Sequence, residues 1–362
     1  MSEVNRGRSS QVFVILTGVS GNLGDAVIRR RVLAWSRGLG EIHAYVGRTT
    51  PGWVEELELR EDEHVYGAES RRSWLRKLVV GRGKRTLVFD PGEVPLGRSH
   101  LKSEVMFLAV VLMLRIRGGI VIRPPRAVGE VSPVVASLYR ASSRLSHVVL
   151  WRDKPSMDRM RVGRISPDTA FAEPAVTGLP TSGRETILIS MRGPRPFPSD
   201  NWFAGIETFA RRHRLKILVM SQVDEDETRS KEIADRFGPG VAEYLPWGAR
   251  TDLEQEREIR RVYERTLITI SDRLHVLILS AQAGSFPVEI APAPRPKVRT
   301  HFETIGVTGT TVDSADLDAE AIASFLDVNS VRHEELGSYM AAARVALETE
   351  VDAFRERVTG AR

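Results

Sequence analysis

Residues 12–30, VFVILTGVSGNLGDAVIRR, join a short apolar run to a helical pattern through a glycine-rich turn. Val12–Leu16 is apolar throughout, as a strand buried in a parallel sheet is, and a helix is expected over 25–37. Three glycines stand in the turn at G-x-x-G-x-x-G spacing: Gly18, Gly21 and Gly24. A strand, a glycine turn and a helix in this order predict an α/β unit at the start of the chain.

The same alternation continues along the chain. Further strands are expected at 42–46, 86–90, 120–123, 147–151, 186–191, 216–221, 267–270 and 287–290. Helical patterns follow most of them, which predicts parallel sheets with helical crossovers. Residues 173–185, EPAVTGLPTSGRE, are rich in proline, glycine and small polar residues and are expected to be a linker. We therefore expect an N-terminal α/β domain over 1–175, a second over 186–315 and a helical tail over 316–362.

Composition sets limits on the class of protein. The chain has 362 residues, more than one core usually organises, with 42% hydrophobic and 27% charged residues. It has no cysteine, which excludes disulfides and thiolate metal sites. The first residues lack the apolar stretch of a signal peptide, and the ten apolar residues Val105–Leu114 are too few to span a bilayer. We expect a cytoplasmic protein.

The charge of the chain is biased toward arginine. The net charge is +5, and arginine suits phosphate and carboxylate groups because its planar fork binds them with two hydrogen bonds. Residues 71–85 carry seven basic residues and no acid. This segment is either a solvated helix face followed by a polar loop or a peripheral contact with the inner face of a membrane. No nucleic acid partner is expected.

The glycine turn raises the hypothesis of a nicotinamide enzyme, and other residues count against it. No tyrosine has a lysine four positions later, as a short-chain reductase would need. Asp25 stands where a pyrophosphate would lie, and its charge would repel that group. Asn22 and Asp25 suit a neutral, hydroxyl-rich ligand better. The alternative is structural, with glycines that allow tight packing and Asp25 stabilised by the helix N-terminus.

A second set of polar residues follows strands of the second half. Ser271-Asp272-Arg273-Leu274-His275 comes directly after the strand 267–270, and Arg192 comes after the strand 186–191. Ligands of open parallel sheets bind at the carboxyl ends of strands, beside helix N-termini. We expect Arg192 and Arg273 to form an anion site with His275 as a proton donor, unless His275 is simply a structural histidine. The acid run at 224–227 is expected to be a solvated helix N-terminus rather than a metal site.

Several short motifs together resemble the polysaccharide pyruvyltransferases. They occur in the family's order over about residues 12–310: GNLGD (21–25), RDKPS (152–156), SPDTAF (166–171), SDRLH (271–275), GSFPVEI (284–290) and Lys297. The resemblance implies a glycosyltransferase-B-like fold of two facing Rossmann-like domains, with a C-terminal helix packing back across them. It implies transfer of pyruvyl from phosphoenolpyruvate to a sugar of a cell-surface polysaccharide or its precursor, forming a ketal.

The resemblance also implies roles for single residues. His275 and Arg273 match the family's R-L-H motif and are the catalytic candidates, with Asp25 as a further one. Phosphoenolpyruvate is expected to bind at Arg192, Arg273, Ser271 and Lys297. The acceptor sugar is expected to bind in the N-terminal domain at Asn22, Asp25 and Gly21. No metal and no cofactor beyond phosphoenolpyruvate as co-substrate are expected.

The sequence departs from the family at one turn. Residues 89–93, Phe-Asp-Pro-Gly-Glu, contain a single glycine where the family has a run of them. The sequence therefore does not decide whether an acceptor sugar binds at this turn or whether the protein is active. Two other functions therefore stay in consideration: a nucleotide-sugar glycosyltransferase of the same fold, and an inactive sugar-binding relative.

Overall fold

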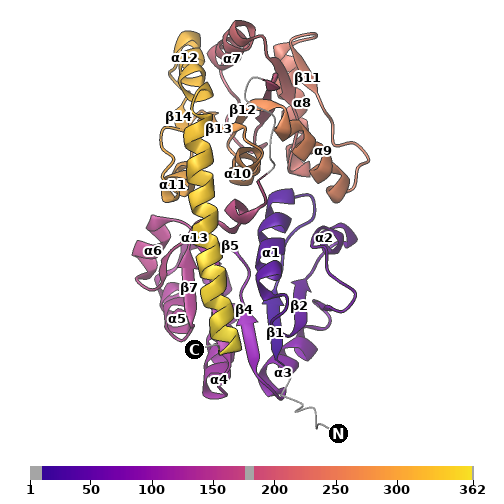
Figure 1. The fold of residues 1–362 in the computed structure, drawn as a ribbon, viewed down its shortest axis with the longest axis vertical. Helices are drawn as coiled ribbons and strands as arrows, with labels where there is room; N and C mark the ends of the chain where they lie inside the picture. Colours follow the sequence, from indigo (N-terminus) through magenta and orange to yellow (C-terminus); the bar gives the residue numbers. More distant parts are fainter. Residues whose placement is uncertain (1–9, 176–182, 361–362) are drawn as a thin grey trace. The chain divides into compact units, whose positions relative to one another are not determined.

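The computed structural model describes residues 10–175 and 183–360. Their contacts divide into two compact units (Figure 1). The first consists of 25–169 with the preceding strand and the end of the chain from 346, and the second consists of 170–345 with the short turn 20–24. Part of the expected linker, 176–182, lies outside the described residues.

The described part of the first unit is built on one parallel sheet of eight strands, in the order β3-β2-β1-β4-β6-β7-β8, with β5 paired to β6. The strands are β1 (Gln11–Ile15), β2 (Glu41–Gly47), β3 (His64–Gly67), β4 (Arg85–Val88), β5 (Gly92–Leu96), β6 (Ile120–Val131), β7 (Val148–Trp151) and β8 (Arg164–Ile165). The helices are α1 (Leu23–Ser36), α2 (Pro51–Glu56), α3 (Arg71–Val80), α4 (Leu101–Ile116), α5 (Pro133–Arg144) and α6 (Lys154–Met160).

The described part of the second unit holds a six-stranded parallel sheet in the order β11-β10-β9-β12-β13-β14. The strands are β9 (Thr186–Ser190), β10 (Lys216–Val219), β11 (Ala242–Tyr244), β12 (Thr266–Ser271), β13 (Phe286–Ala291) and β14 (Thr311–Asp313). The helices are α7 (Asp200–His213), α8 (Glu227–Phe237), α9 (Asp252–Glu264), α10 (Leu274–Gln282), α11 (Pro296–Thr304), α12 (Ala319–Ser330) and α13 (His333–Thr359).

The sheet cores follow from the apolar runs of the sequence. Every residue of β9 and β12 is buried, because helices cover both faces of a parallel sheet. The long helix α13 contributes its first part, up to Val345, to the second unit and the remainder to the first. The expected fold class, α/β with two Rossmann-like units and a long C-terminal helix, is confirmed.

The basic segment 71–85 forms the helix α3, a loop over 81–84 and the first residue of β4, which agrees with the expected helix followed by a loop. Trp74 is 2% exposed and Leu78 is fully buried, and both pack in the core of the first unit. The Trp74 indole donates a hydrogen bond to the carbonyl of His43 at 3.0 Å. These two apolar side chains are therefore not available to a membrane surface. Within the described ranges, no helix is long and apolar enough to cross a bilayer.

Candidate functional site

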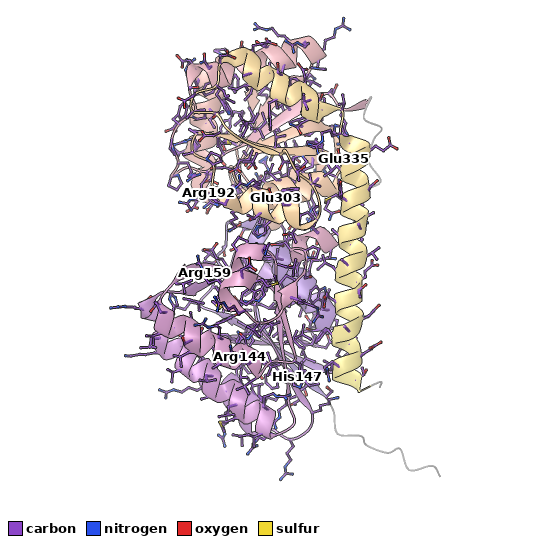
Figure 2. All side chains as sticks on the ribbon, turned by 90° about the vertical axis from the view of Figure 1, so that its left-hand side faces the viewer. Arg144, His147, Arg159, Arg192, Glu303 and Glu335 are labelled. Carbon is purple, nitrogen blue, oxygen red and sulfur yellow. The ribbon has the colours of Figure 1, made fainter. Side chains whose placement is uncertain are left out.

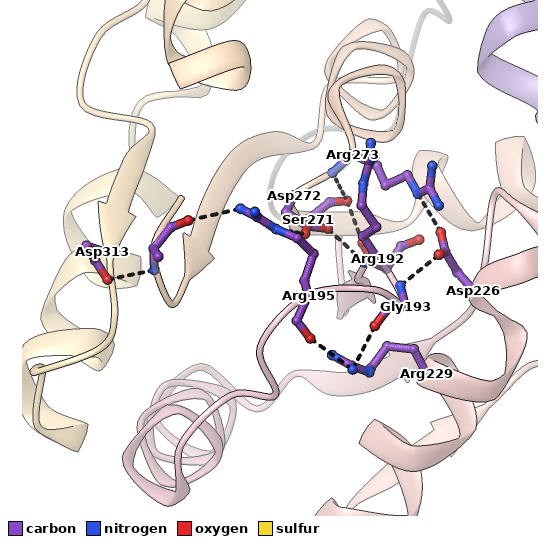
Figure 3. Close-up of polar contacts among 11 residues, drawn as sticks. Arg192, Gly193, Arg195, Asp226, Arg229, Ser271, Asp272, Arg273 and Asp313 are labelled. Carbon is purple, nitrogen blue, oxygen red and sulfur yellow. Dashed lines mark hydrogen bonds and ion pairs between the residues drawn. The ribbon is translucent and has the colours of Figure 1, made fainter. Parts of the chain in front are cut away.

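The carboxyl edge of the second sheet brings the two predicted arginines together. The strand order reverses between β9 and β12, which are hydrogen-bonded neighbours. Arg192 comes two residues after the end of β9, and Arg273 comes two residues after the end of β12. The reversal point of an open parallel sheet is where its ligands bind. Figure 3 shows the polar contacts at this edge.

Arg273 is held by two acidic side chains. Its Nε donates to Asp226 Oδ2 at 2.5 Å and its Nη2 donates to Glu225 Oε1 at 3.0 Å. Burial lowers the pKa of Arg273, but the hydrogen bonds and charges of Asp226 and Glu225 outweigh it and leave the pKa above its ordinary value. Asp226 also accepts from the Gly193 N–H at 2.8 Å, which ties the loop after β9 to the same carboxylate. Arg273 is thus fixed in place.

The expectation of a solvated acid run at 224–227 is wrong for Asp226. Asp224 and Glu225 are exposed, as predicted, but Asp226 is 1% exposed and paired with Arg273. The run follows β10, a neighbour of β9, so its acids reach the carboxyl edge of the sheet. That position after a strand was the signal that could have revealed the pair.

Asp272 organises the loop that carries Arg192. Its Oδ1 accepts from the Arg192 backbone N–H at 2.8 Å, and its Oδ2 lies 3.6 Å from Nε of Arg195. Burial raises the pKa of the Asp272 carboxyl against the opposing hydrogen bond and nearby arginines. Arg229 donates through Nη2 to the carbonyls of Gly193 and Arg195, at 2.8 and 3.0 Å. The loop therefore has a defined shape before any ligand binds.

The side chain of Arg192 differs from its neighbours because its guanidinium has no protein partner among the described residues. It is half-buried in the second unit, where Figure 2 labels it. Burial is the main cause that lowers the pKa of Arg192, and the charges of Arg273 and Arg295 lower it further. A partly desolvated cation beside other cations is stabilised by an anion. This is the feature of the edge that most directly indicates a ligand.

The other predicted residues of this unit are Ser271, His275 and Lys297. Ser271 Oγ donates to the Ser190 carbonyl at 2.5 Å and accepts from the Arg273 N–H at 3.0 Å, so this hydroxyl joins the two strands. His275 lies in the first turn of α10, and Lys297 lies in the first turn of α11 and is half-buried. The sequence prediction missed Arg295, whose charge acts on Arg192.

Protein side chains fill the space around the three glycines of the turn 18–24. A Cβ on Gly18 would lie 2.1 Å from the Trp53 ring. One on Gly21 would lie 2.4 Å from the Asp224 carboxyl carbon, and one on Gly24 would lie 2.4 Å from His275 Cβ. The three glycines leave room for these side chains, which supports the structural alternative for the turn over a dinucleotide site.

The predicted acceptor residues have the following contacts. The Gly21 N–H donates to Asp252 Oδ2 at 3.1 Å, and its carbonyl accepts from the Asp224 N–H at 2.9 Å. Asn22 forms an isolated antiparallel bridge with Val223. The Asp25 carboxylate lies 3.8 Å from Nη1 of Arg29, one helical turn on, and is one-third exposed. The backbone of Gly21 is therefore fully used within the protein.

The first unit has a pocket of about 220 Å³ at the carboxyl edge of its own sheet. Apolar and aromatic side chains form most of its wall, among them Trp74 and Phe107. Asp90, from the turn 89–93, lines it and accepts from Arg126 Nη2 at 2.9 Å. Glu104 also lines it, is 6% exposed, and has its pKa raised by burial. The pocket combines apolar walls with a few polar groups, as small-molecule sites do.

Similar folds occur among solved epimerases and glycosyltransferases. A putative UDP-N-acetylglucosamine 2-epimerase of Listeria monocytogenes aligns with a TM-score of 0.57 at 11% identity, over 96% of each chain. The UDP-GlcNAc 2-epimerase of Neisseria meningitidis, solved with UDP-GlcNAc, aligns with 0.56 at 11% identity, over 95% of this chain and 100% of that one. CalG4, the calicheamicin glycosyltransferase, aligns with 0.52 at 11% identity, over 98% and 99%.

These likenesses define the class of fold as GT-B-like, with two Rossmann-like units. They do not extend to the level of a family. No family model matches the sequence, and no curated protein matches it.

Proposed function

We propose that the protein transfers a pyruvyl group from phosphoenolpyruvate to a sugar of a cell-surface polysaccharide or its precursor, forming a ketal. The observation that carries the proposal is the Arg192 guanidinium, half-buried and without a protein partner among the described residues, beside the fixed Arg273. Phosphoenolpyruvate has a carboxylate and a phosphate ester on the same carbon, C2, and guanidinium groups bind both kinds of oxyanion. The sequence motifs support this choice of anion.

In the proposed reaction, Arg192 binds an oxyanion of phosphoenolpyruvate, and Arg273 adds positive charge and shapes the site through Asp226. A proton is added to the methylene carbon, and a sugar hydroxyl attacks the cation formed at C2 and loses its proton. Phosphate then leaves, and a neighbouring hydroxyl closes the ketal and loses its proton. We assign His275 to one of these proton transfers, which are typically worth on the order of 10² to 10⁴ in rate.

The acceptor is proposed to bind through residues of the N-terminal part of the chain, of which Asn22 belongs to the second unit and Asp25 to the first. Asn22 and Asp25 remain the sequence-based candidates for its hydroxyl groups. The pocket with Asp90, Arg126 and Glu104 offers a second set of polar groups against apolar walls, a combination that suits a sugar ring. We expect Asp90→Asn to weaken acceptor binding and to leave phosphoenolpyruvate binding unchanged.

A nucleotide-sugar glycosyltransferase is the second candidate, because the fold is similar to that of CalG4 and the same cations would accept a diphosphate. Isothermal titration of the full chain with phosphoenolpyruvate, UDP-GlcNAc and NADPH separates the hypotheses. Saturable binding of phosphoenolpyruvate supports pyruvyl transfer, whereas binding of UDP-GlcNAc without phosphoenolpyruvate supports the glycosyltransferase. With an acceptor in hand, His275→Ala is expected to abolish phosphate release, and near-normal turnover would contradict its assigned role.

A further inference from the structure

Two histidines and a glutamate meet on the first unit's sheet, at the edge opposite the pocket. Glu41 and His43 are two residues apart in β2, so their side chains lie on the same face. His64 begins β3 and is the register partner of His43. These residues show no metal-ligand spacing in the sequence, because they come from two separate strands whose pairing the sequence does not state.

The three ligand atoms converge. Glu41 Oε1 lies 2.7 Å from His64 Nε2 and 3.3 Å from His43 Nε2, and all three atoms lie within 4.8 Å of one another. A zinc ion bound at about 2.0 to 2.2 Å by three tetrahedral ligands needs these atoms roughly 3.3 Å apart. His64 and Glu41 are 51% and 34% exposed at their side chains, so they are free to make the small adjustment.

The outer contacts orient these ligands. His43 is fully buried, and its Nδ1 lies 3.2 Å from the Tyr66 hydroxyl, which leaves Nε2 directed at Glu41 Oε1. The other carboxylate oxygen of Glu41 accepts from Gln11 Nε2 at 3.2 Å. Hydrogen bonds to the second atom of a ligand are what fix ligands in metal sites.

A cation already occupies part of this space. Lys77 Nζ lies 3.4 Å from Glu41 Oε1, with its side chain 37% exposed. A bound metal ion would repel this ammonium group and compete with it for the carboxylate. Removal of this ammonium group by Lys77→Met is therefore expected to strengthen metal binding.

We propose that Glu41, His43 and His64 form a site for a divalent transition-metal ion of the zinc class, with water as the remaining ligand. Two imidazoles and one carboxylate are a donor set of zinc sites, and imidazole disfavours Mg²⁺ and Ca²⁺, which prefer oxygen ligands. The site joins the edge strand β3 to β2. It lies at the amino end of these strands and is independent of the proposed function.

The test is isothermal titration of ZnCl₂ into the metal-free full chain, with thermal unfolding measured in parallel. We expect one saturable ion per chain and a higher melting temperature with zinc, because a ligand of the native state stabilises it. His64→Ala, which removes an exposed ligand, is expected to weaken binding at least tenfold, and Lys77→Met is expected to tighten it. His213→Ala is the control, since His213 pairs with the single carboxylate Asp327 in the second unit.

Excess Mg²⁺ is expected to leave zinc binding unchanged. Absence of saturable zinc binding would overturn the proposal. Zinc binding with unchanged affinity in His64→Ala would also overturn the proposal, because the ion would then be bound elsewhere. Neither result bears on phosphoenolpyruvate binding in the second unit.

Discussion

Replacement of Arg192 separates a ligand-binding arginine from a structural one. Its guanidinium makes no hydrogen bond or ion pair within the described residues, so Arg192→Met removes no protein contact of that group. Burial and the charge of Arg273 lower the pKa of Arg192, which means that the charged guanidinium reduces the stability of the folded protein. We therefore expect the free energy of unfolding of Arg192→Met to equal or exceed that of the wild type.

The same substitution is expected to weaken phosphoenolpyruvate binding. A hydrogen bond to a charged group contributes about 1.5 to 3 kcal/mol, which corresponds to roughly 10- to 150-fold in Kd. Arg192→Lys keeps the charge but loses the planar fork, so an intermediate loss is expected. Isothermal titration gives Kd, and urea unfolding gives stability. Arg211→Met is the control, because Arg211 is an exposed arginine of α7 in the same unit.

Two results would refute this reasoning. Unchanged phosphoenolpyruvate affinity in Arg192→Met would show that the guanidinium does not bind the ligand. A large loss of stability would show that Arg192 is a structural residue, whatever happens to binding.

Three further predictions concern stability. Asp226→Asn removes the buried one of the two carboxylates that pair with Arg273 and leaves only the exposed Glu225, and a loss of about 3 to 5 kcal/mol is expected in urea unfolding; a loss below 1 kcal/mol would contradict the buried pairing. Burial raises the pKa of Glu289 to about 7, so the stability that its protonated form contributes is full below about pH 4.5 and declines as the pH rises through 7. Glu289→Gln should therefore reduce the fall in unfolding free energy between pH 5 and pH 8, and an identical pH profile would exclude this group as its source. Gly24→Ala puts a methyl group 2.4 Å from His275 Cβ, and a loss of roughly 1 to 3 kcal/mol is expected; an unchanged melting temperature would mean that the turn relaxes freely.

The sequence predicted the sheets well because buried parallel strands are apolar on both faces. The strand expected over 267–270 is the centre of β12, every residue of which is buried. β3 was missed because HVYG is a short strand with its first two residues exposed, and it has no apolar run to reveal it. Patterns of burial are visible in a sequence only where burial is extensive.

The site was predictable to the extent that topology determines it. Arg192 and Arg273 were found because each follows a strand, and parallel strands end at one edge. The ion pair between Arg273 and Asp226 was not predicted, because it joins residues 47 positions apart in the sequence through tertiary contact. The same limit hid the cluster of Glu41, His43 and His64, which depends on which strands pair and in what register.

The most direct test of the central claim is a crystal structure of the protein soaked with phosphoenolpyruvate. We expect density for the three-carbon phosphate ester at the carboxyl edge of β9 and β12, with an oxyanion at about 2.7 to 2.9 Å from the Arg192 guanidinium. Density for the ligand at another place, or an empty edge at saturating phosphoenolpyruvate, would contradict it.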